Sequence, residues 1–154
     1  MQLVCVLHNI RSVHNVGSIF RTADAAGVSK IILTGYTPTP LDRFGRERKD
    51  LAKVALGAEK TMPWAYIKNP PAAIKKLQEE GFDVIALEQD PRAENIFAFI
   101  PKHNIALVLG NEVRGVSNAL LAKCDHIVEI PMHGKKESLN VAVAAGVALF
   151  TLNH

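Results

Sequence analysis

Residues 3–7, Leu-Val-Cys-Val-Leu, and residues 104–109, Asn-Ile-Ala-Leu-Val-Leu, are the stretches of sequence that decide the fold. Both are short and almost continuously apolar, which is typical of strands buried on both faces of a parallel sheet. Three more runs of this kind occur at Lys30–Thr34, Phe82–Leu87 and His126–Ile130. We therefore predict five buried strands.

Segments with helical spacing separate these strands. They cover His14–Ala26, Glu47–Leu56, Pro70–Glu80, Ser117–Ala122 and Leu139–Leu152. Because strands and helices alternate, we predict an α/β fold with a mostly parallel sheet and helices on both faces. Residues 35–42 contain two prolines and are expected to form a surface loop. With no repeat and no linker, residues 1–154 are expected to be a single domain.

Composition narrows the class of protein. The 154 residues are 48% hydrophobic and 21% charged, which is typical of a globular chain. No apolar run reaches the length of a membrane span, and Met1–Arg11 looks like a first strand and not a signal peptide. Cys5 and Cys124 show neither metal-ligand nor disulfide spacing, so we expect inert thiols in a reducing compartment such as the cytoplasm.

Positive charge is concentrated in one segment. The net charge is +3 and the pI about 9.0, and residues 43–53 alone hold five basic and two acidic side chains. A basic loop that contains an aromatic residue, Phe44, suits a phosphate backbone. The alternative is a solvated helix start with local ion pairs.

Three runs of polar residues follow predicted strands. The first contains Asn15, Gly17 and Arg21 at the start of a helix, where it could bind an anion or simply cap the helix through Ser12 or Asn15. Since a helical side chain leans toward the N-terminus, we expect Gly17 to leave open space for the guanidinium of Arg21.

The second run, Gly110-Asn-Glu-Val-Arg-Gly115, lacks the lysine of a phosphate loop, because Val116 stands in its place. A nucleotide-dependent enzyme of that type is therefore disfavoured. What remains is a glycine-flanked turn that a ligand could approach closely, or a turn with exposed charges.

The third run extends from Ile130 to Asn140 and precedes the most apolar helix. Ser138 is the expected N-cap of that helix, with Asn140 in its first turn. The loop could form the wall of a binding site. The helix after it is apolar on nearly every side, so we expect it to pack against a second copy of the chain in a homodimer.

The sequence gives little support for metal-dependent or nucleophilic catalysis. The six histidines show no metal-ligand spacing, so we expect no metal. No nucleophile motif is found, and Glu88 and Asp90 are interpreted as ordinary loop charges.

Taken in order, the three runs resemble the TrmH/SpoU family of the SPOUT RNA methyltransferases. The resemblance rests on Asn15, Gly17 and Arg21, then on Leu109, Gly110, Glu112 and Gly115, and last on Ile130, Pro131, Met132, Ser138, Leu139 and Asn140. It covers nearly the whole chain and matches the minimal size of the family. It implies a C-terminal trefoil knot, a homodimer whose formation completes the active site, and transfer of a methyl group from S-adenosyl-L-methionine to a ribose 2′-hydroxyl of RNA (tRNA or rRNA).

The resemblance also implies roles for particular residues. The catalytic set would be Arg21, Asn15, Glu112, Ser138 and Asn140. The cofactor would be held by Leu87, Gly110, Ile130, Met132, Ser138 and Leu139. Arg21 would be either a base or a clamp that stabilises charge on a phosphate or alkoxide, and an arginine is normally always protonated.

RNA is expected on the basic segment, at Arg43, Arg46, Arg48 and Lys49. Two alternatives stay open at this point. One is a non-catalytic RNA-binding protein that kept the SPOUT fold, and the other is a SPOUT enzyme that methylates a base.

Overall fold

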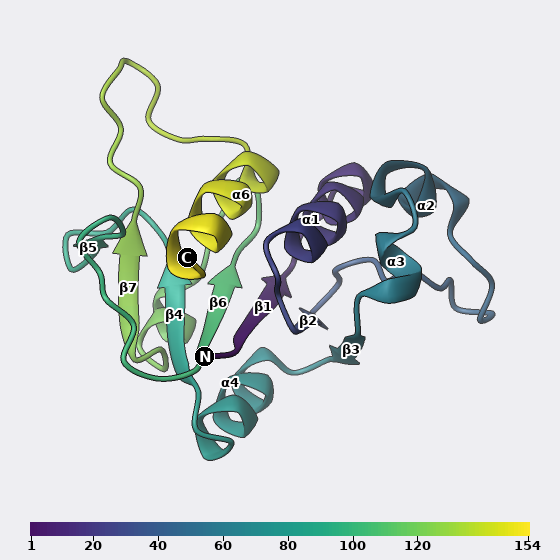
Figure 1. Cartoon of the computed structure of the whole chain (residues 1–154), viewed down its shortest axis with the longest axis horizontal. Helices are drawn as coiled ribbons and strands as arrows, with labels where there is room; N and C mark the ends of the chain where they lie inside the picture. The colour runs from purple at the N-terminus through teal and green to yellow at the C-terminus, as the bar shows by residue number, and fades with distance from the viewer.

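All 154 residues are described by a computed structural model, in which a seven-stranded sheet forms the centre (Figure 1). The strands are β1 (Leu3–His8), β2 (Lys30–Thr34), β3 (Trp64–Ile67), β4 (Asp83–Leu87), β5 (Glu94–Asn95), β6 (Ile105–Leu109) and β7 (His126–Glu129). Their order is β3-β2-β1-β6-β4-β7-β5, and every neighbouring pair is parallel. The five predicted strands are confirmed to within one residue at each end.

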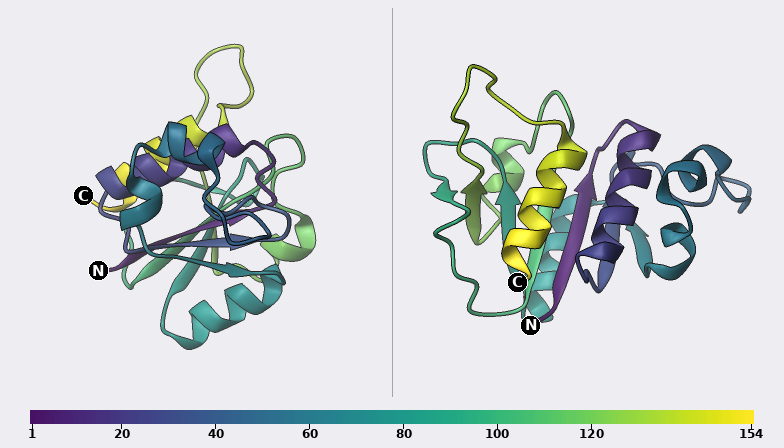
Figure 2. Two further views of the ribbon diagram at one scale, coloured as in Figure 1. Left: turned by 90° about the vertical axis from the view of Figure 1, so that its right-hand side faces the viewer. Right: turned by 45° about the horizontal axis from the view of Figure 1, so that its top comes forward.

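Helices cover both faces of the sheet, as predicted (Figure 2). They are α1 (Val13–Ala25), α2 (Lys49–Ala55), α3 (Ala58–Thr61), α4 (Pro70–Glu79), α5 (Asn118–Leu121) and α6 (Val141–Leu152). α1, α2, α3 and α6 pack on one face, and α4 and α5 pack on the other. No helix is long and apolar enough to cross a membrane.

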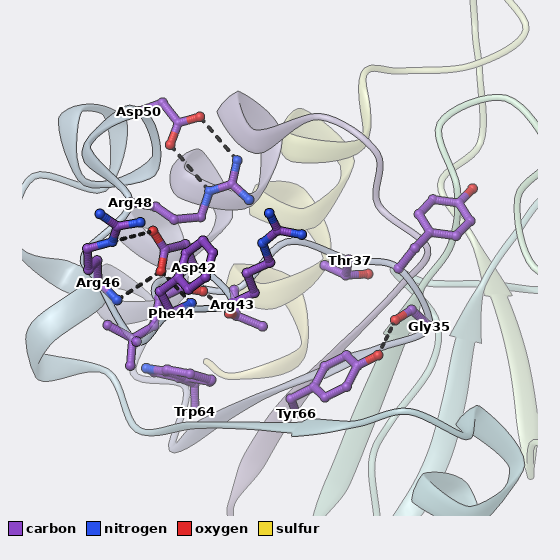
Figure 3. A pocket seen from close by; sticks show the side chains of 14 residues that line it. Gly35, Thr37, Asp42, Arg43, Phe44, Arg46, Arg48, Asp50, Trp64 and Tyr66 are labelled. Carbon is purple, nitrogen blue, oxygen red and sulfur yellow. Dashed lines mark hydrogen bonds and ion pairs between the residues drawn. The ribbon is translucent and has the colours of Figure 1, made fainter.

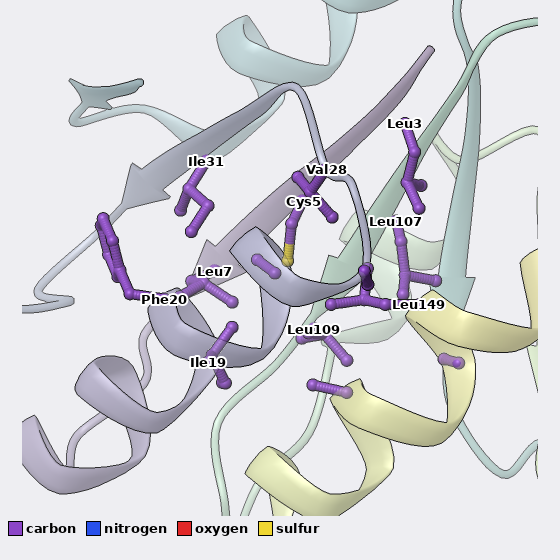
Figure 4. Packing of buried hydrophobic residues seen from close by; sticks show 14 of the residues in the cluster. Leu3, Cys5, Leu7, Ile19, Phe20, Val28, Ile31, Leu107, Leu109 and Leu149 are labelled. Carbon is purple, nitrogen blue, oxygen red and sulfur yellow. The ribbon is translucent and has the colours of Figure 1, made fainter. Parts of the chain in front are cut away.

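Each central strand contributes side chains to two cores. Along β1, Leu3, Cys5 and Leu7 belong to the larger core under α1 and α6 (Figure 4). Val4 and Val6 belong to the smaller core on the other face. Successive side chains of a strand point to opposite faces, so a strand with helices on both sides must be apolar throughout. This explains why the first stretch of the sequence has no polar residue between Leu3 and Leu7.

Two strands and one helix were not predicted. β3 and β5 are the edge strands of the sheet, and their side chains are half-buried or exposed. An edge strand therefore lacks the continuous apolar pattern of the central strands. α3 is a single short turn of helix after Gly57.

The expected open space beside Gly17 is wrong. A Cβ at Gly17 would lie 2.8 Å from the main-chain oxygen of Leu51 and 3.0 Å from the Cβ of Val54. Gly17 therefore allows α2 to pack closely on α1, and α2 fills the space beside Gly17 itself. Arg21 is nevertheless exposed and borders a depression between the two helices. On the other face of α1, the apolar side chains of Val16, Ile19, Phe20 and Ala23 are fully buried.

Candidate functional site

The three polar runs meet at one edge of the sheet. The β1–α1 loop, the β6–α5 turn and the β7–α6 loop all start where parallel strands end, and β6, β4 and β7 are neighbours. In open α/β sheets, ligands bind outside these carboxyl ends. The predicted motifs are thus brought together although about a hundred residues separate the first from the second.

Glu112 joins the first two runs. Its carboxylate accepts hydrogen bonds from the main-chain N–H groups of Arg11 (2.8 Å) and Ser12 (2.9 Å) and from Nδ2 of Asn15 (3.0 Å). Partial burial disfavours the charged form, but the three donors outweigh it and hold the pKa of Glu112 below its ordinary value. Glu112 is therefore an anion that positions the start of α1.

Asn140 joins the third run to the first. Its Nδ2 donates to Oδ1 of Asn15 at 3.3 Å, and its own Oδ1 accepts from the N–H groups of Ala142 (2.9 Å) and Val143 (3.4 Å). Asn140 is thus the N-cap of α6. The prediction that Ser138 caps this helix is wrong, because the helix begins two residues later, and Ser138 is left exposed in the loop.

A cavity of about 220 Å³ opens beside this network. All six residues expected to hold the cofactor line it: Leu87, Gly110, Ile130, Met132, Ser138 and Leu139. Glu112 lines it as well. The lining thus combines apolar side chains from strand ends and the β7–α6 loop with the carboxylates of Glu88, Glu112 and Glu129.

The glycines of the β6–α5 turn are required by close contacts. A Cβ at Gly110 would lie 2.5 Å from the carbonyl carbon of Gly115. Gly115 has a φ of +64°, and a Cβ there would lie 2.4 Å from Oε2 of Glu88. The main chain of the turn therefore folds back on itself with no room for side chains at either glycine.

Glu88 and Asn111 were missed from the sequence. Glu88 also lines the cavity, and its Oε2 accepts from the N–H of Val116 at 2.9 Å, so it is not the ordinary loop charge that we expected. Oδ1 of Asn111 accepts from the N–H groups of Val113 (2.9 Å) and Arg114 (2.8 Å), which holds the turn in shape. Their signal was position, since Glu88 directly follows the buried strand β4 and Asn111 lies two residues after the end of β6.

Arg21 lies apart from the other expected catalytic residues. Its exposed side chain does not line the cavity but a separate depression between α1 and α2, together with His14, Asp50 and Lys53. Arg21 makes no hydrogen bond or ion pair with any other side chain. Within one copy of the chain, the structure therefore does not bring Arg21 to Glu112 and Asn140.

The basic segment borders a wide depression of about 1050 Å³, which we call the aromatic basin (Figure 3). Its lining includes Tyr36, Arg43, Phe44, Arg46, Arg48, Trp64 and Tyr66. Arg46 pairs with Asp42 at 3.5 Å and Arg48 with Asp50 at 3.3 Å, so local ion pairs do form, as the alternative interpretation expected. Lys49 begins α2 and does not line the basin.

No group of three or more His, Cys, Asp or Glu side chains lies close enough to hold a metal ion. Both cysteines are free, and burial raises the pKa of Cys5 to about 12 and that of Cys124 to about 11. Thiols with such pKa values are inert at neutral pH, as predicted.

The fold and the site define an α/β protein with a ligand cavity at the carboxyl ends of a parallel sheet. Residues 2–150 match the model of the SpoU rRNA Methylase family, and the chain belongs to this family. The TrmH/SpoU resemblance of the three motifs is thereby confirmed.

Named relatives agree with this assignment. The chain is 38% identical over 148 residues to the 23S rRNA (guanosine-2′-O-)-methyltransferase RlmB of Ralstonia nicotianae, a match that covers 96% of this chain and 57% of that protein. It is 36% identical to an uncharacterized tRNA/rRNA methyltransferase of Archaeoglobus fulgidus, with 97% and 63% covered. The chain therefore spans somewhat more than half the length of these relatives.

Solved structures show the same fold. An rRNA methyltransferase from Sinorhizobium meliloti with bound AdoMet has a TM-score of 0.88 at 29% identity, covering 97% of this chain and 55% of that one. A structure described as giving insights into the 2-OH methylation of C/U34 on tRNA has a TM-score of 0.79 at 28% identity, with 96% and 91% covered. The SPOUT-type fold is thus confirmed, and the trefoil knot stays a prediction.

Proposed function

We propose that this protein transfers a methyl group from S-adenosylmethionine to a ribose 2′-hydroxyl of RNA. The observation that carries the proposal is the cavity at the ends of β4, β6 and β7, which all six expected cofactor residues line. Family membership and the rRNA 2′-O-methyltransferases among the relatives support it. Residues 1–154 would form one catalytic domain.

The lining of the cavity fits this cofactor. Leu87, Ile130 and Leu139 offer an apolar wall for an adenine ring, and the side-chain-free main chain at Gly110 allows close approach. Glu88 and Glu129 would supply negative charge to a cavity that holds a cationic cofactor. When bound, S-adenosylmethionine supplies an electrophilic methyl group, for which the chain must orient a hydroxyl.

The chain's own residues would orient the ribose. Glu112 has a lowered pKa and three hydrogen-bond donors, so it is a poor base and serves as a positioning residue. Asn15 and Asn140 would hold the sugar and neighbouring groups from the same network, with Ser138 on the exposed loop. Methyl transfer depends mainly on such orientation.

Arg21 would complete the site as a clamp on phosphate or on the developing alkoxide. It is exposed, permanently charged and without a carboxylate partner in its own chain. Because it does not line the cavity of its own copy, we infer that Arg21 serves the cavity of a partner copy. Arg21→Ala should therefore lower the methylation rate far more than the affinity for S-adenosylmethionine, measured by calorimetry.

The proposed partner is a second copy of the chain, packed on α6. Val143 and Phe150 lie seven positions apart on this helix, and each is 53% exposed. Because both apolar side chains lie on one exposed face, their burial against a second copy would stabilise a dimer. Light scattering should give a dimer for the native chain and a monomer for Phe150→Glu, and a monodisperse native monomer at micromolar concentration would refute the homodimer.

Calorimetric titration with S-adenosylmethionine tests the cofactor assignment. Binding by the native protein and not by Gly110→Ala is the expected result, and Gly134→Ala is the matched control because its Cβ would meet nothing within 4 Å. Failure of the folded native protein to bind would favour a non-catalytic RNA-binding protein.

A cytoplasmic location belongs to the same proposal. It is supported by the two cysteines, which are both free.

A further inference from the structure

The aromatic basin carries an exposed aromatic ring between two guanidinium groups. Phe44 is 64% exposed, and the guanidinium carbons of Arg43 and Arg46 each lie 4.8 Å from the centre of its ring (Figure 3). Trp64 and Tyr66, both from the edge strand β3, line the same basin. Exposed aromatic rings with neighbouring arginines are the usual means of binding unpaired nucleic-acid bases.

The tip that carries Phe44 is held in place before any ligand binds. Oδ1 of Asp42 accepts from the N–H groups of Phe44 (2.8 Å) and Arg46 (2.9 Å), and the N–H of Asp42 donates to the main-chain oxygen of Arg46 (2.7 Å). Gly45 turns the chain at a φ of +77°. A preorganised ring loses little conformational freedom on binding, so its contact area counts toward affinity.

Charge alone does not account for this surface. Asp42 and Asp50 pair with Arg46 and Arg48, which leaves Arg43 as the arginine of the basin without a carboxylate partner. A site for phosphate only would keep its cations free and would need no rings, whereas here two of the three arginines are paired and four aromatic side chains line the basin. Bases in a duplex are stacked on each other, so only unpaired nucleotides can offer their faces to Phe44.

Shared lining residues link the basin to the cofactor cavity through a second depression. Tyr36 lines both the basin and a second depression of about 820 Å³, whose lining includes Arg11, Arg114 and Glu112. That depression shares Glu112 with the cofactor cavity. Nδ2 of Asn111 donates to the hydroxyl of Tyr36 at 2.9 Å, which fixes this junction.

We propose that the aromatic basin is a base-stacking site for an unpaired segment of RNA, which continues past Tyr36 and Arg114 to the Glu112 edge of the cofactor cavity. The inference rests on the proposed function for the identity of the nucleic acid. It adds the substrate class, an RNA loop or single strand, and a site outside the reacting centre. Arg11 and Arg114 supply the positive charge along the path, and Phe44 and Trp64 supply the stacking surfaces.

The single tryptophan of the chain reports directly on the basin. We expect a single-stranded RNA of about twelve nucleotides to quench the fluorescence of Trp64 saturably, and the same sequence in a duplex to quench it much less. Anisotropy of a labelled RNA, measured in parallel without cofactor, gives the affinity. Binding of single-stranded RNA that leaves Trp64 fluorescence unchanged, or equal binding of the duplex, would overturn the proposal.

Phe44→Ala tests the stacking contact, and Phe97→Ala is its control, because Phe97 is also exposed (58%) and does not line the basin. Phe44→Ala should weaken single-stranded RNA binding roughly tenfold or more, with Phe44→Tyr and Phe97→Ala close to the native protein. Equal affinity of Phe44→Ala and native protein would refute the basin.

Different results would refute the proposed methyl transfer and the proposed base-stacking site. If native protein methylates RNA and Phe44→Ala binds RNA normally, only the basin is wrong. If RNA binds in the basin but no 2′-O-methylated nucleoside forms, the proposed function is wrong and the stacking site stands.

Discussion

Replacing Glu112 by glutamine tests how the site is held together. The carboxylate bridges the β6–α5 turn and the β1–α1 loop through three N–H donors at 2.8, 2.9 and 3.0 Å. Glutamine keeps the shape but has one oxygen only, and its NH₂ group would face an N–H donor. At least one hydrogen bond to a charged acceptor is therefore lost.

We expect Glu112→Gln to cause a moderate loss of stability. A hydrogen bond to a charged group contributes about 1.5–3 kcal/mol, and Glu112 is exposed enough for solvent to screen part of this. We expect Glu112→Gln to lower the free energy of unfolding by about 1–2 kcal/mol. For a chain of this size, that corresponds to a fall in Tm of roughly 2–8 °C.

The lowered pKa of Glu112 determines how its contribution to stability changes with pH. Because the pKa of Glu112 is lower in the folded protein than its ordinary value of 4.5, the carboxylate stabilises the fold above about pH 4.5. This contribution is lost as the pH falls through the folded-state pKa. The stability difference between native protein and Glu112→Gln should therefore be full at pH 7 and shrink on acidification below pH 4.5.

Chemical denaturation from pH 7 down to about pH 3.5, the region where carboxylates titrate, is the assay. Glu79→Gln is the control, since Glu79 is exposed on α4 and makes no hydrogen bond or ion pair through its side chain. The reasoning is refuted if Glu112→Gln is as stable as the native protein at pH 7, or if its deficit is the same at both ends of the range.

Three further predictions concern the same architecture. Gly110→Ala places a Cβ 2.5 Å from the carbonyl carbon of Gly115, so the S-adenosylmethionine affinity measured by calorimetry should fall at least about tenfold, and native affinity would contradict the close contact. Asn140→Ala removes the N-cap of α6 and should lower the unfolding free energy in urea by about 1 kcal/mol; Asn140→Asp, which keeps the capping oxygen, should recover most of it, and equal losses would exclude capping as the cause. Cys5, buried and with a pKa of about 12, should resist alkylation at pH 8 until the protein is unfolded, and fast labelling of the native protein, followed by mass spectrometry, would contradict its burial.

The central sheet could be predicted because burial leaves a simple pattern. Strands such as β1 and β6 have helices on both faces, so their sequences are apolar without interruption. The edge strand β3, with a half-buried Trp64 and an exposed Tyr66, lacks that pattern and was missed. The strand order, which brings β4 between β6 and β7, depends on long-range packing that no local pattern records.

Many residues of the site could be predicted from the sequence, but their packing and hydrogen-bond partners could not. The family resemblance gave six of the residues that line the cavity, but the role of Gly17 depends on α2, a helix more than thirty residues further along the chain. Likewise, Ser138 was predicted to cap α6 with Asn140 in its first turn, and the observed start of the helix at Val141 makes Asn140 the cap instead. Glu88 looked like a loop charge because its partner, the N–H of Val116, is distant in sequence.

The most direct test of the proposed methyl transfer is mass spectrometry of nucleosides. The purified protein would be incubated with tRNA or rRNA and S-adenosylmethionine that carries an isotopically labelled methyl group, and the RNA would then be digested to nucleosides. We expect the label in a 2′-O-methylated nucleoside, and its loss with Arg21→Ala. Label in a base-methylated nucleoside, or unlabelled RNA from a protein that binds the cofactor, would contradict it.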